Sequence, residues 1–399
     1  MSLVPIPDNS VLLGRPVPFS LHNRHGELLL ARGSCIDDTR QLDHWLWAGL
    51  FVDVQEAEAF ERAYKHQLDN MLRGGALLGK IAHEIPKMKA EDLGHIRASE
   101  PVLSWPDIHE RLRLLLRDPR ADDFEARLQK IAHDLTWHAQ RSPDTSLLRL
   151  ILTASESAID YCATHSLLTG LLCQLCAVHV ESWDTQAQHS LVLAALSMNI
   201  SMATMQDHLA VQHLGPAPAQ RELIQKHSDN SVALLQSLGV DDPLWLDAVA
   251  FHHAPLFGRM TEHAVGQQLA RMIQRADLFG AALSPRQYRA GRNAARAAQA
   301  AILDGNRKPD EAGTMLVKTI GLYPPGTWVR LASGELALVV HRSQSPETPR
   351  VLSFVGRNGM LLGEPAPRDT RQPQNAVVQA LAASQVKVRI NLEKLLKLL

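Results

Sequence analysis

The feature that most constrains this chain is a long series of helical apolar patterns in its centre. Between residues 146 and about 318, apolar positions recur at three- and four-residue spacing in one segment after another. The predicted helices are 147–159, 165–180, 189–202, 220–238, 243–252, 263–279 and 286–303. Because 399 residues exceed one ordinary core, we expect several domains, of which this helical bundle is the central one.

Strand patterns flank the helical series on both sides. On the N-terminal side they lie at 17–21, 27–31 and 50–54, with a turn at Asn23–Gly26 and short predicted helices at 37–47 and 57–72. On the C-terminal side, a small antiparallel module is predicted from 328–331, 336–341, 350–355 and 360–362. The chain from Gln374 onward has helical propensity.

These patterns predict a multi-domain α+β protein. Its central all-α bundle stands between small β-rich modules at the N-terminal and C-terminal sides. The predicted divisions are a β-rich domain (1–58), a helical connecting region (59–145), the helical bundle (146–318), an antiparallel β-module (319–366) and a tail with a terminal helix (367–399).

Composition excludes several classes of protein. A net charge of -1 gives no overall field that would attract nucleic acid or an anionic membrane. The segment Met1–Pro7 lacks the pattern of a signal peptide. The longest apolar run, near Leu167–Val180, is too short for a membrane span and contains Gln174 and His179. We therefore expect a cytoplasmic protein with neither a membrane span nor a nucleic-acid partner.

Cysteine usage fits a reducing compartment. Cys173 and Cys176 form a CxxC pair, with Cys162 a short distance before them. Since the pair lies inside a continuous helical pattern and no second CxxC follows, we interpret these residues as buried thiols on an apolar face. Redox or zinc chemistry is the alternative.

Five residues with metal-binding side chains are spread along the helical series in a recognisable order. They are His165, which follows Tyr161 in a Tyr-x-x-x-His-Ser sequence, then His227, His252, His253 and Asp277. Their order and contexts resemble the HD-GYP family of metal-dependent cyclic-dinucleotide phosphodiesterases. The segment LARMIQRADLFGAALSPRQYRAG around Asp277 and the later segment GLYPPGTWVRLASGELALVV carry the same resemblance.

The resemblance implies an HD-type helical bundle and a site for divalent metal. In such a site, metal lowers the pKa of a bound water and neutralises charge on phosphoryl oxygens. The five residues are then the inherited ligand positions.

The central motif departs from the family. Where the family has His-Asp-Ile-Gly-Lys, this chain has Met198, Asn199, Ile200, Ser201 and Met202. A thioether is a poor ligand for these metals, and a neutral amide does not bridge two cations as a carboxylate does.

A second family segment is altered as well. The Glu that follows the paired histidines is Ala254, and the Gly-Tyr-Pro signature is missing, so that the chain is expected to pass directly into the next helix. We therefore expect no catalytic residues at Met198, Asn199, Met202 or Ala254.

Arg286 and Arg289 resemble the basic residues of the family that hold dinucleotide phosphates. A guanidinium suits bidentate phosphate contact. The alternative is an ordinary solvated helix face shared with Arg292 and Arg296.

Three functions remain open. The favoured one is a catalytically impaired HD-GYP-like protein, which acts as a sensor or protein-interaction module in cyclic di-GMP-related signalling. Its partners would be another signalling protein, cyclic di-GMP or a second copy of the chain. A second hypothesis is residual phosphodiesterase activity through an incomplete His/Asp site. A third places the function in the terminal β-modules.

No cofactor is expected for the favoured function. The alternative is one divalent ion (Fe, Mn, Zn or Ni) at a partial set of the five ligand positions.

Overall fold

The chain divides into two compact units, Met1–Val102 and Leu103–Leu399. The structure is a computed structural model. It describes residues 3–5, 17, 19–23, 26, 28–36, 50–54, 56, 102–120, 123–343 and 345–398.

The first unit contains a small antiparallel sheet. Its strands, in the order β1-β4-β2-β3, are β1 (Leu3–Pro5), β4 (Phe51–Asp53), β2 (Leu21–His22) and β3 (Leu28–Leu30). Strands β3 and β4 fall within predicted strands, whereas β1 was not predicted. Of the described residues of the predicted strand 17–21, only Leu21 is in a strand. The amide N–H of Gly26 donates to the carbonyl of Asn23 across the predicted turn, and a φ of +85° explains the glycine there. The helices predicted at 37–47 and 57–72 lie outside the described residues.

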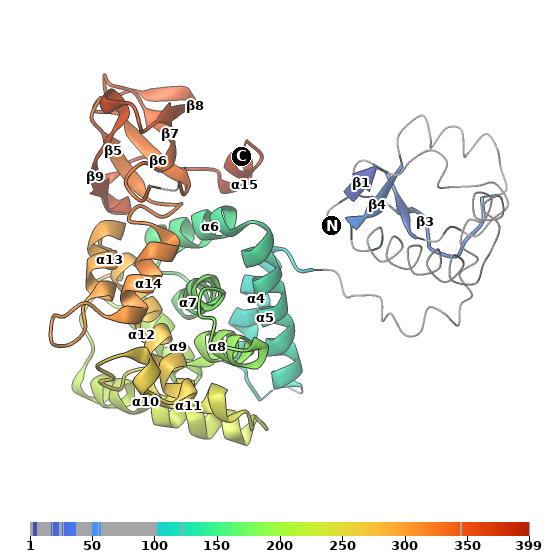
Figure 1. Ribbon diagram of the computed structural model, residues 1–399, viewed down its shortest axis with the longest axis vertical. Helices are drawn as coiled ribbons and strands as arrows, with labels where there is room; N and C mark the ends of the chain where they lie inside the picture. Colours follow the sequence, from blue (N-terminus) through green and yellow to red (C-terminus); the bar gives the residue numbers. More distant parts are fainter. Residues whose placement is uncertain are drawn as a thin grey trace. The chain divides into compact units, whose positions relative to one another are not determined.

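The second unit begins with a helical bundle (Figure 1). Its α-helices are α4 (Trp105–Arg117), α5 (Phe124–Arg141), α6 (Pro143–Glu156), α7 (Tyr161–Ala177), α8 (Thr185–Ser197), α9 (Ala203–Val211), α10 (Pro218–Ser237), α11 (Pro243–Phe251), α12 (Val265–Leu283), α13 (Ala294–Ile302) and α14 (Glu311–Ile320). Every residue of α7 is buried, because α4, α5, α6, α8, α12 and α14 all pack against it. Helix α7 is therefore the central element of the bundle.

Capping residues set where several of these helices begin. The side chains of Ser104, Asp184, Asp242 and Asp310 each accept a hydrogen bond from a backbone N–H in the first turn that follows. Such N-caps satisfy donors that have no partner within the helix.

The region before α13 differs from the prediction. The predicted helix 286–303 begins only at Ala294, where Asn293 provides the N-cap. Residues Arg286 and Arg289 instead close a tight turn through reciprocal backbone hydrogen bonds of 2.7 and 2.8 Å. Pro285 precedes this turn, and proline disfavours helical geometry in the residue before it. The expectation that Arg286 and Arg289 lie on a helix is therefore wrong.

A five-stranded antiparallel sheet follows the bundle, in the order β8-β7-β6-β5-β9. Its strands are β5 (Trp328–Leu331), β6 (Leu336–His341), β7 (Arg350–Val355), β8 (Leu361–Asp369) and β9 (Val377–Leu381). The first three confirm the predicted strands. Strand β8 is longer than predicted, and β9 replaces predicted helix because it pairs with β5.

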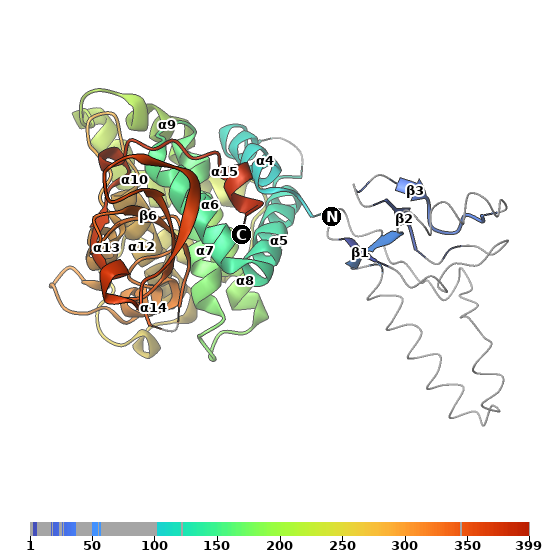
Figure 2. The same ribbon diagram turned by 90° about the horizontal axis from the view of Figure 1, so that it is seen from above.

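The sheet packs onto the bundle through α6. Leu148 and Leu152 of α6 share a buried cluster with Trp328, Leu338 and the short helix α15 (Leu392–Leu396). In Figure 2 the C-terminal strands lie over the helices. The described residues confirm the predicted architecture of a central helical bundle with a small antiparallel sheet in each terminal region.

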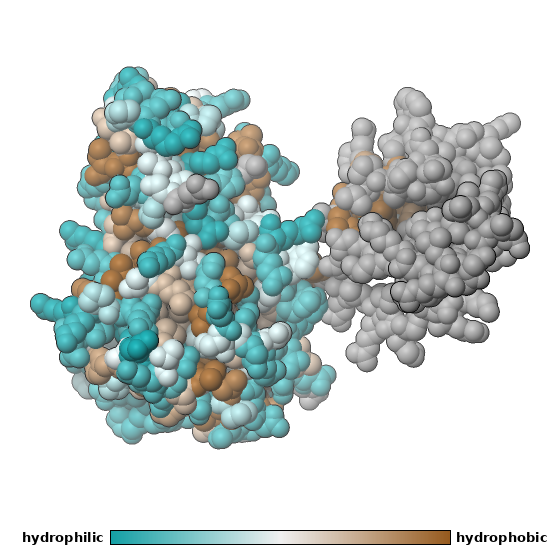
Figure 3. Space-filling view, in the orientation of Figure 1, coloured by the Kyte–Doolittle hydropathy of each residue, from teal (hydrophilic) through white to brown (hydrophobic). Residues whose placement is uncertain are grey.

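The visible surface of the second unit mixes hydrophilic side chains with small groups of apolar ones (Figure 3). Among the described residues, no helix combines the length and apolar character required to cross a bilayer.

Candidate metal centre

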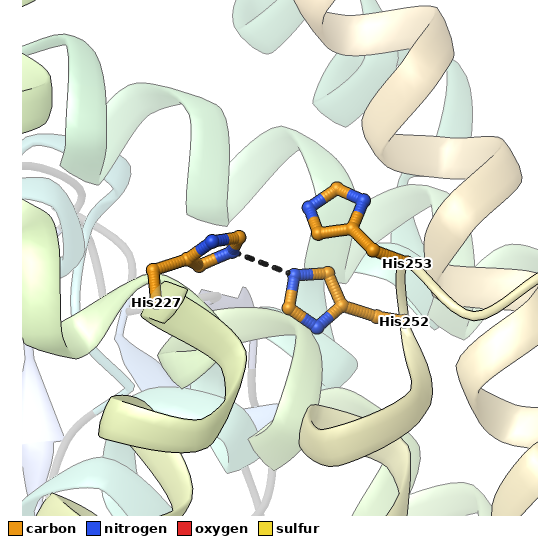
Figure 4. A group of neighbouring side chains, drawn as sticks. All are labelled: His227, His252 and His253. Atoms are coloured by element: carbon orange, nitrogen blue, oxygen red, sulfur yellow. Dashed lines mark hydrogen bonds between the residues drawn. The ribbon is translucent and has the colours of Figure 1, made fainter. Parts of the chain in front are cut away.

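Three histidines from two neighbouring helices converge on one point (Figure 4). His227 lies on α10, and His252 and His253 follow directly on the end of α11. One ring nitrogen from each can be chosen so that all three lie within 4.8 Å of one another. His227 and His252 are buried, whereas His253 is exposed, so the group opens to solvent on one side. The paired histidines and His227, far apart in the sequence, are thus brought together.

Hydrogen bonds fix the tautomers of the two buried rings. The Nδ1 of His227 lies 2.5 Å from the carbonyl oxygen of Ile224, and that of His252 lies 2.6 Å from the carbonyl of Val249. A carbonyl oxygen only accepts, so each Nδ1 carries the proton and donates it. Each neutral ring then presents the lone pair of Nε2, and these two Nε2 atoms face each other at 3.0 Å.

This arrangement fits a divalent cation. Two nitrogens bound about 2.1 Å from one ion lie about 3.0 Å apart in an octahedral site and about 3.4 Å apart in a tetrahedral one. A metal-bound histidine commonly donates its second ring N–H to a backbone carbonyl, as both rings do here. Burial, reinforced by His253, lowers the pKa of His252 to about 3. Burial also lowers the pKa of His227. Both rings therefore stay neutral, the form that binds metal.

The other two predicted ligands form a separate pair. The Nε2 of buried His165, on α7, lies 2.7 Å from Oδ1 of Asp277, on α12. Burial by itself would raise the pKa of Asp277, but the hydrogen bond with His165 and the nearby His253 and His252 lower it to about 2. Asp277 is thus an ionised carboxylate close enough to influence the histidine group without being one of its three members.

An aromatic ring connects His165 to a basic residue. The ring of Tyr161 stacks on His165 at 5.3 Å between centroids, and the guanidinium of Arg286 lies over Tyr161 at 5.2 Å. Burial disfavours the charge of Arg286, but the hydroxyls of Tyr161 and Tyr288 raise its pKa above the ordinary value. Arg289 has a different role, because its Nη2 donates to the carbonyl of Ala281 at the end of α12.

Comparison with known proteins supports the resemblance. No protein-family model matches the sequence. The chain is 27% identical over 235 residues to "Cyclic di-GMP phosphodiesterase PA4108" of Pseudomonas aeruginosa, an alignment that covers 57% of this chain and 56% of that protein. The chain thus matches about half the length of this relative. The solved structure "Bd1817, a HDG"Y"P protein from Bdellovibrio bacteriovorus" matches with a TM-score of 0.43 and 13% identity, covering 79% of this chain and 98% of that one.

The predicted resemblance to the HD-GYP family is confirmed. Residues 198–202, which the resemblance aligns with the central motif of the family and which we call the altered motif, lie between α8 and α9. Met198 is fully buried in the core at the end of α8, and Asn199 is buried at the start of the short 3₁₀ helix η2 (Ile200–Met202). Met202 is half-buried. The helix predicted over 189–202 therefore ends at Ser197.

The segment after the paired histidines is a loop. The expectation that the chain passes directly into the next helix is wrong, since residues 252–264 separate α11 from α12 and include the 3₁₀ helix η3 (Met260–Glu262). The carbonyl of Ala254 accepts from the side chain of Gln274, and the amide N–H of Met260 donates to Glu311. Side chains of α12 and α14 thus hold this loop, a role that the sequence did not reveal.

The cysteines of α7 do not join the candidate centre. Cys162, Cys173 and Cys176 are buried free thiols, and burial raises the pKa of Cys176 to about 12. Such thiols are poor nucleophiles and poor ligands.

Proposed function

We propose that this chain is a catalytically impaired HD-GYP-like protein, which acts in cyclic di-GMP-related signalling by binding rather than by hydrolysis. The observation that carries the proposal is the donor set of the candidate centre, which consists of three histidines. The resemblance places a bridging carboxylate at the position of Asn199. Without an anionic bridge, two cations at this centre would repel each other without compensation.

The donor set supports one ion. Three imidazoles favour borderline ions such as Zn²⁺ or Ni²⁺ over Mn²⁺, because affinity at nitrogen sites rises along the first-row series. When bound, such an ion would supply a positive charge able to attract an oxyanion. His227 and His252 would hold it from the buried side and His253 from the solvent side.

The pair formed by His165 and Asp277 supports the same proposal. In a site with two metals, both residues would face cations. Here the Nε2–H of His165 donates to the carboxylate of Asp277 at 2.7 Å, so each residue directs toward the other an atom that would otherwise face a metal.

Arg286 is the stronger candidate of the two arginines for a phosphate contact. Its guanidinium is half-buried and donates to the hydroxyls of Tyr288 and Tyr161, and its buried Nε has no hydrogen-bond partner among the residues that the structure describes. Arg289 is occupied with carbonyls at the end of α12. Partners of the binding function would be cyclic di-GMP, another signalling protein or a second copy of the chain.

Calorimetric titration with cyclic di-GMP tests the binding proposal. Saturable heat that is diminished in Arg286→Ala but retained in Arg292→Ala would support a sensor. If cyclic di-GMP releases no heat and does not change the binding of metal, protein interaction remains as the function. Rapid turnover of cyclic di-GMP by the unaltered protein loaded with Mn²⁺ or Fe²⁺ would overturn the proposal in favour of the residual phosphodiesterase.

Restoring the central motif alone should not restore full catalysis. In the double variant Met198→His/Asn199→Asp, we expect tighter metal binding but turnover of cyclic di-GMP at least about a hundredfold below that of an intact metal-dependent phosphodiesterase, because positions Met202 and Ala254 still lack their polar groups. Hydrolysis measured with Mn²⁺ or Fe²⁺, with Asn199→Asp alone as the control, checks this expectation. Robust activity in the double variant would contradict it.

A further inference from the structure

Two serine hydroxyls connect the altered motif to the helix that carries His227. Ser201 lies on η2 and Ser231 lies on α10, where it is fully buried. The hydroxyl of Ser201 donates to the backbone carbonyl of His227 at 3.0 Å, and the hydroxyl of Ser231 donates to that of Ser201 at 2.9 Å. The amide N–H of Ser201 completes the group by donating to Oγ of Ser231 at 3.3 Å.

Donors and acceptors in this group match without remainder. Each hydroxyl donates one hydrogen bond and accepts one. The carbonyl of His227 also accepts from the N–H of Ser231 within the helix, as α-helical geometry requires, and its second lone pair receives Ser201. The carbonyl of His227 and the side chain of Ser231 therefore belong to one turn of α10, and both bind the same residue of η2.

The contact depends on this chain's own residue at position 201. The resemblance places glycine there, and glycine has no hydroxyl to donate. The bond to His227 thus accompanies the substitutions at Met198 and Asn199 in the same turn.

We propose that Ser201 and Ser231 are positioning residues for His227. The Nε2 atoms of His227 and His252 lie 3.0 Å apart, so the two rings can reach one ion only while the His227 ring keeps its direction. The hydrogen-bonded serines fix the backbone of His227 against η2, while its Nδ1 donates to Ile224. Together these bonds leave the ring little freedom and direct Nε2 toward His252. The inference rests on the proposed metal-binding function of the three histidines.

The test compares zinc binding by Ser201→Ala, Ser231→Ala and the double variant, measured by calorimetry with zinc alone. We expect each single variant to bind about tenfold more weakly than the unaltered protein, the usual loss when an outer partner of a metal ligand is removed. The double variant should lose no more than either single one, because the three bonds act as a unit. Ser201→Thr, which keeps the hydroxyl, should restore most of the affinity.

Ser146→Ala is the matched control. Ser146 is equally buried, and its hydroxyl bonds only to carbonyls at and before the start of its own helix α6. It should lower the melting temperature as much as Ser231→Ala does and leave zinc affinity unchanged. Equal zinc affinity in all serine variants would show that the group only stabilises the fold, and would overturn the inference.

A second measurement separates this inference from the metal proposal. In metal-free protein, the ring ¹⁵N chemical shifts of His227 should move in Ser231→Ala and stay in place in Ser146→Ala. If the unaltered protein binds no zinc but these shifts move, the positioning role stands and the metal proposal fails. If the shifts do not move, the positioning role fails whether or not zinc binds.

Discussion

At the scale of single residues, the chemistry of the candidate centre depends on which proton each imidazole holds. The carbonyls of Ile224 and Val249 accept hydrogen bonds from the Nδ1–H groups of His227 and His252, so those protons stay on Nδ1. Because burial also disfavours a second proton on either ring, both remain metal-binding bases. The same property makes the stability of the protein depend on pH.

Metal-free protein should lose stability as the pH falls below 6.5. His252 has an unfolded pKa of 6.5 and a folded pKa of about 3, so between these values the unfolded state binds more protons. The stability from neutral His252 is complete above pH 6.5 and decreases toward pH 3. Between pH 6.5 and 5 the loss should be about 2 kcal/mol. Urea unfolding at both pH values measures it.

His252→Gln is the control for this pH dependence. The variant removes the titrating group. Its loss of unfolding free energy between pH 6.5 and 5 should therefore be about 2 kcal/mol smaller than that of the unaltered protein. Groups that do not contact His252 contribute equally in both proteins and cancel in the comparison. Identical pH dependence of the two proteins would show that His252 keeps an ordinary pKa.

At the scale of elements, the central helix α7 begins without a cap of its own. Asp160 at its N-cap has a φ of +49° and makes no capping hydrogen bond with its side chain. Instead, Oδ1 of Asp207, on α9, accepts from the N–H of Cys162 at 2.8 Å, and Arg117 of α4 donates to both Asp160 and Asp207. Two other helices thus determine where α7 begins. No local signal in the sequence indicates this cap, because the capping residue lies 45 positions away.

Removing this distant cap should destabilise the second unit. Asp207→Ala should lower the free energy of unfolding by about 1–2 kcal/mol, and Asp207→Asn by less, since its amide oxygen still accepts. Urea unfolding checks both. The control is Glu393→Ala, which breaks an exposed ion pair with Arg149 and should cost at most about 0.5 kcal/mol. An Asp207→Ala variant as stable as this control would show that the cap contributes little.

At the scale of the whole molecule, the C-terminal sheet is part of the hydrophobic packing of the bundle. Leu148 and Leu152 of α6 are buried beneath Trp328 and Leu338. On the other side, α6 packs against α7, which carries His165. The sheet therefore packs against α6, the helix that in turn packs against the central helix α7.

A chain of residues 103–399 should melt cooperatively, because it is one compact unit with its own core. A chain of residues 103–321 should not, since it exposes the two leucines of α6. At about 2 kcal/mol for each buried leucine, the loss is roughly 4 kcal/mol before any other contact is counted. Thermal melting followed by circular dichroism distinguishes the two chains. Equal melting temperatures of the two chains would show that the sheet does not stabilise the bundle.

The amino-acid sequence by itself determined the helical series and the strands β5 to β7, because apolar periodicity and turn residues are local properties. It also determined the order in which the five metal-binding side chains occur. It misjudged 286–293 and β9, where contacts with distant segments override local propensity.

Only the tertiary structure decided how the five side chains are grouped. It united His227 with His252 and His253, and it paired His165 with Asp277. It also assigned the ring protons and brought Ser201 to the carbonyl of His227. The physical reason is that a hydrogen bond or a shared ion depends on distances of a few ångströms between groups far apart in the chain, and the packing of α7, α10, α11 and α12 sets those distances.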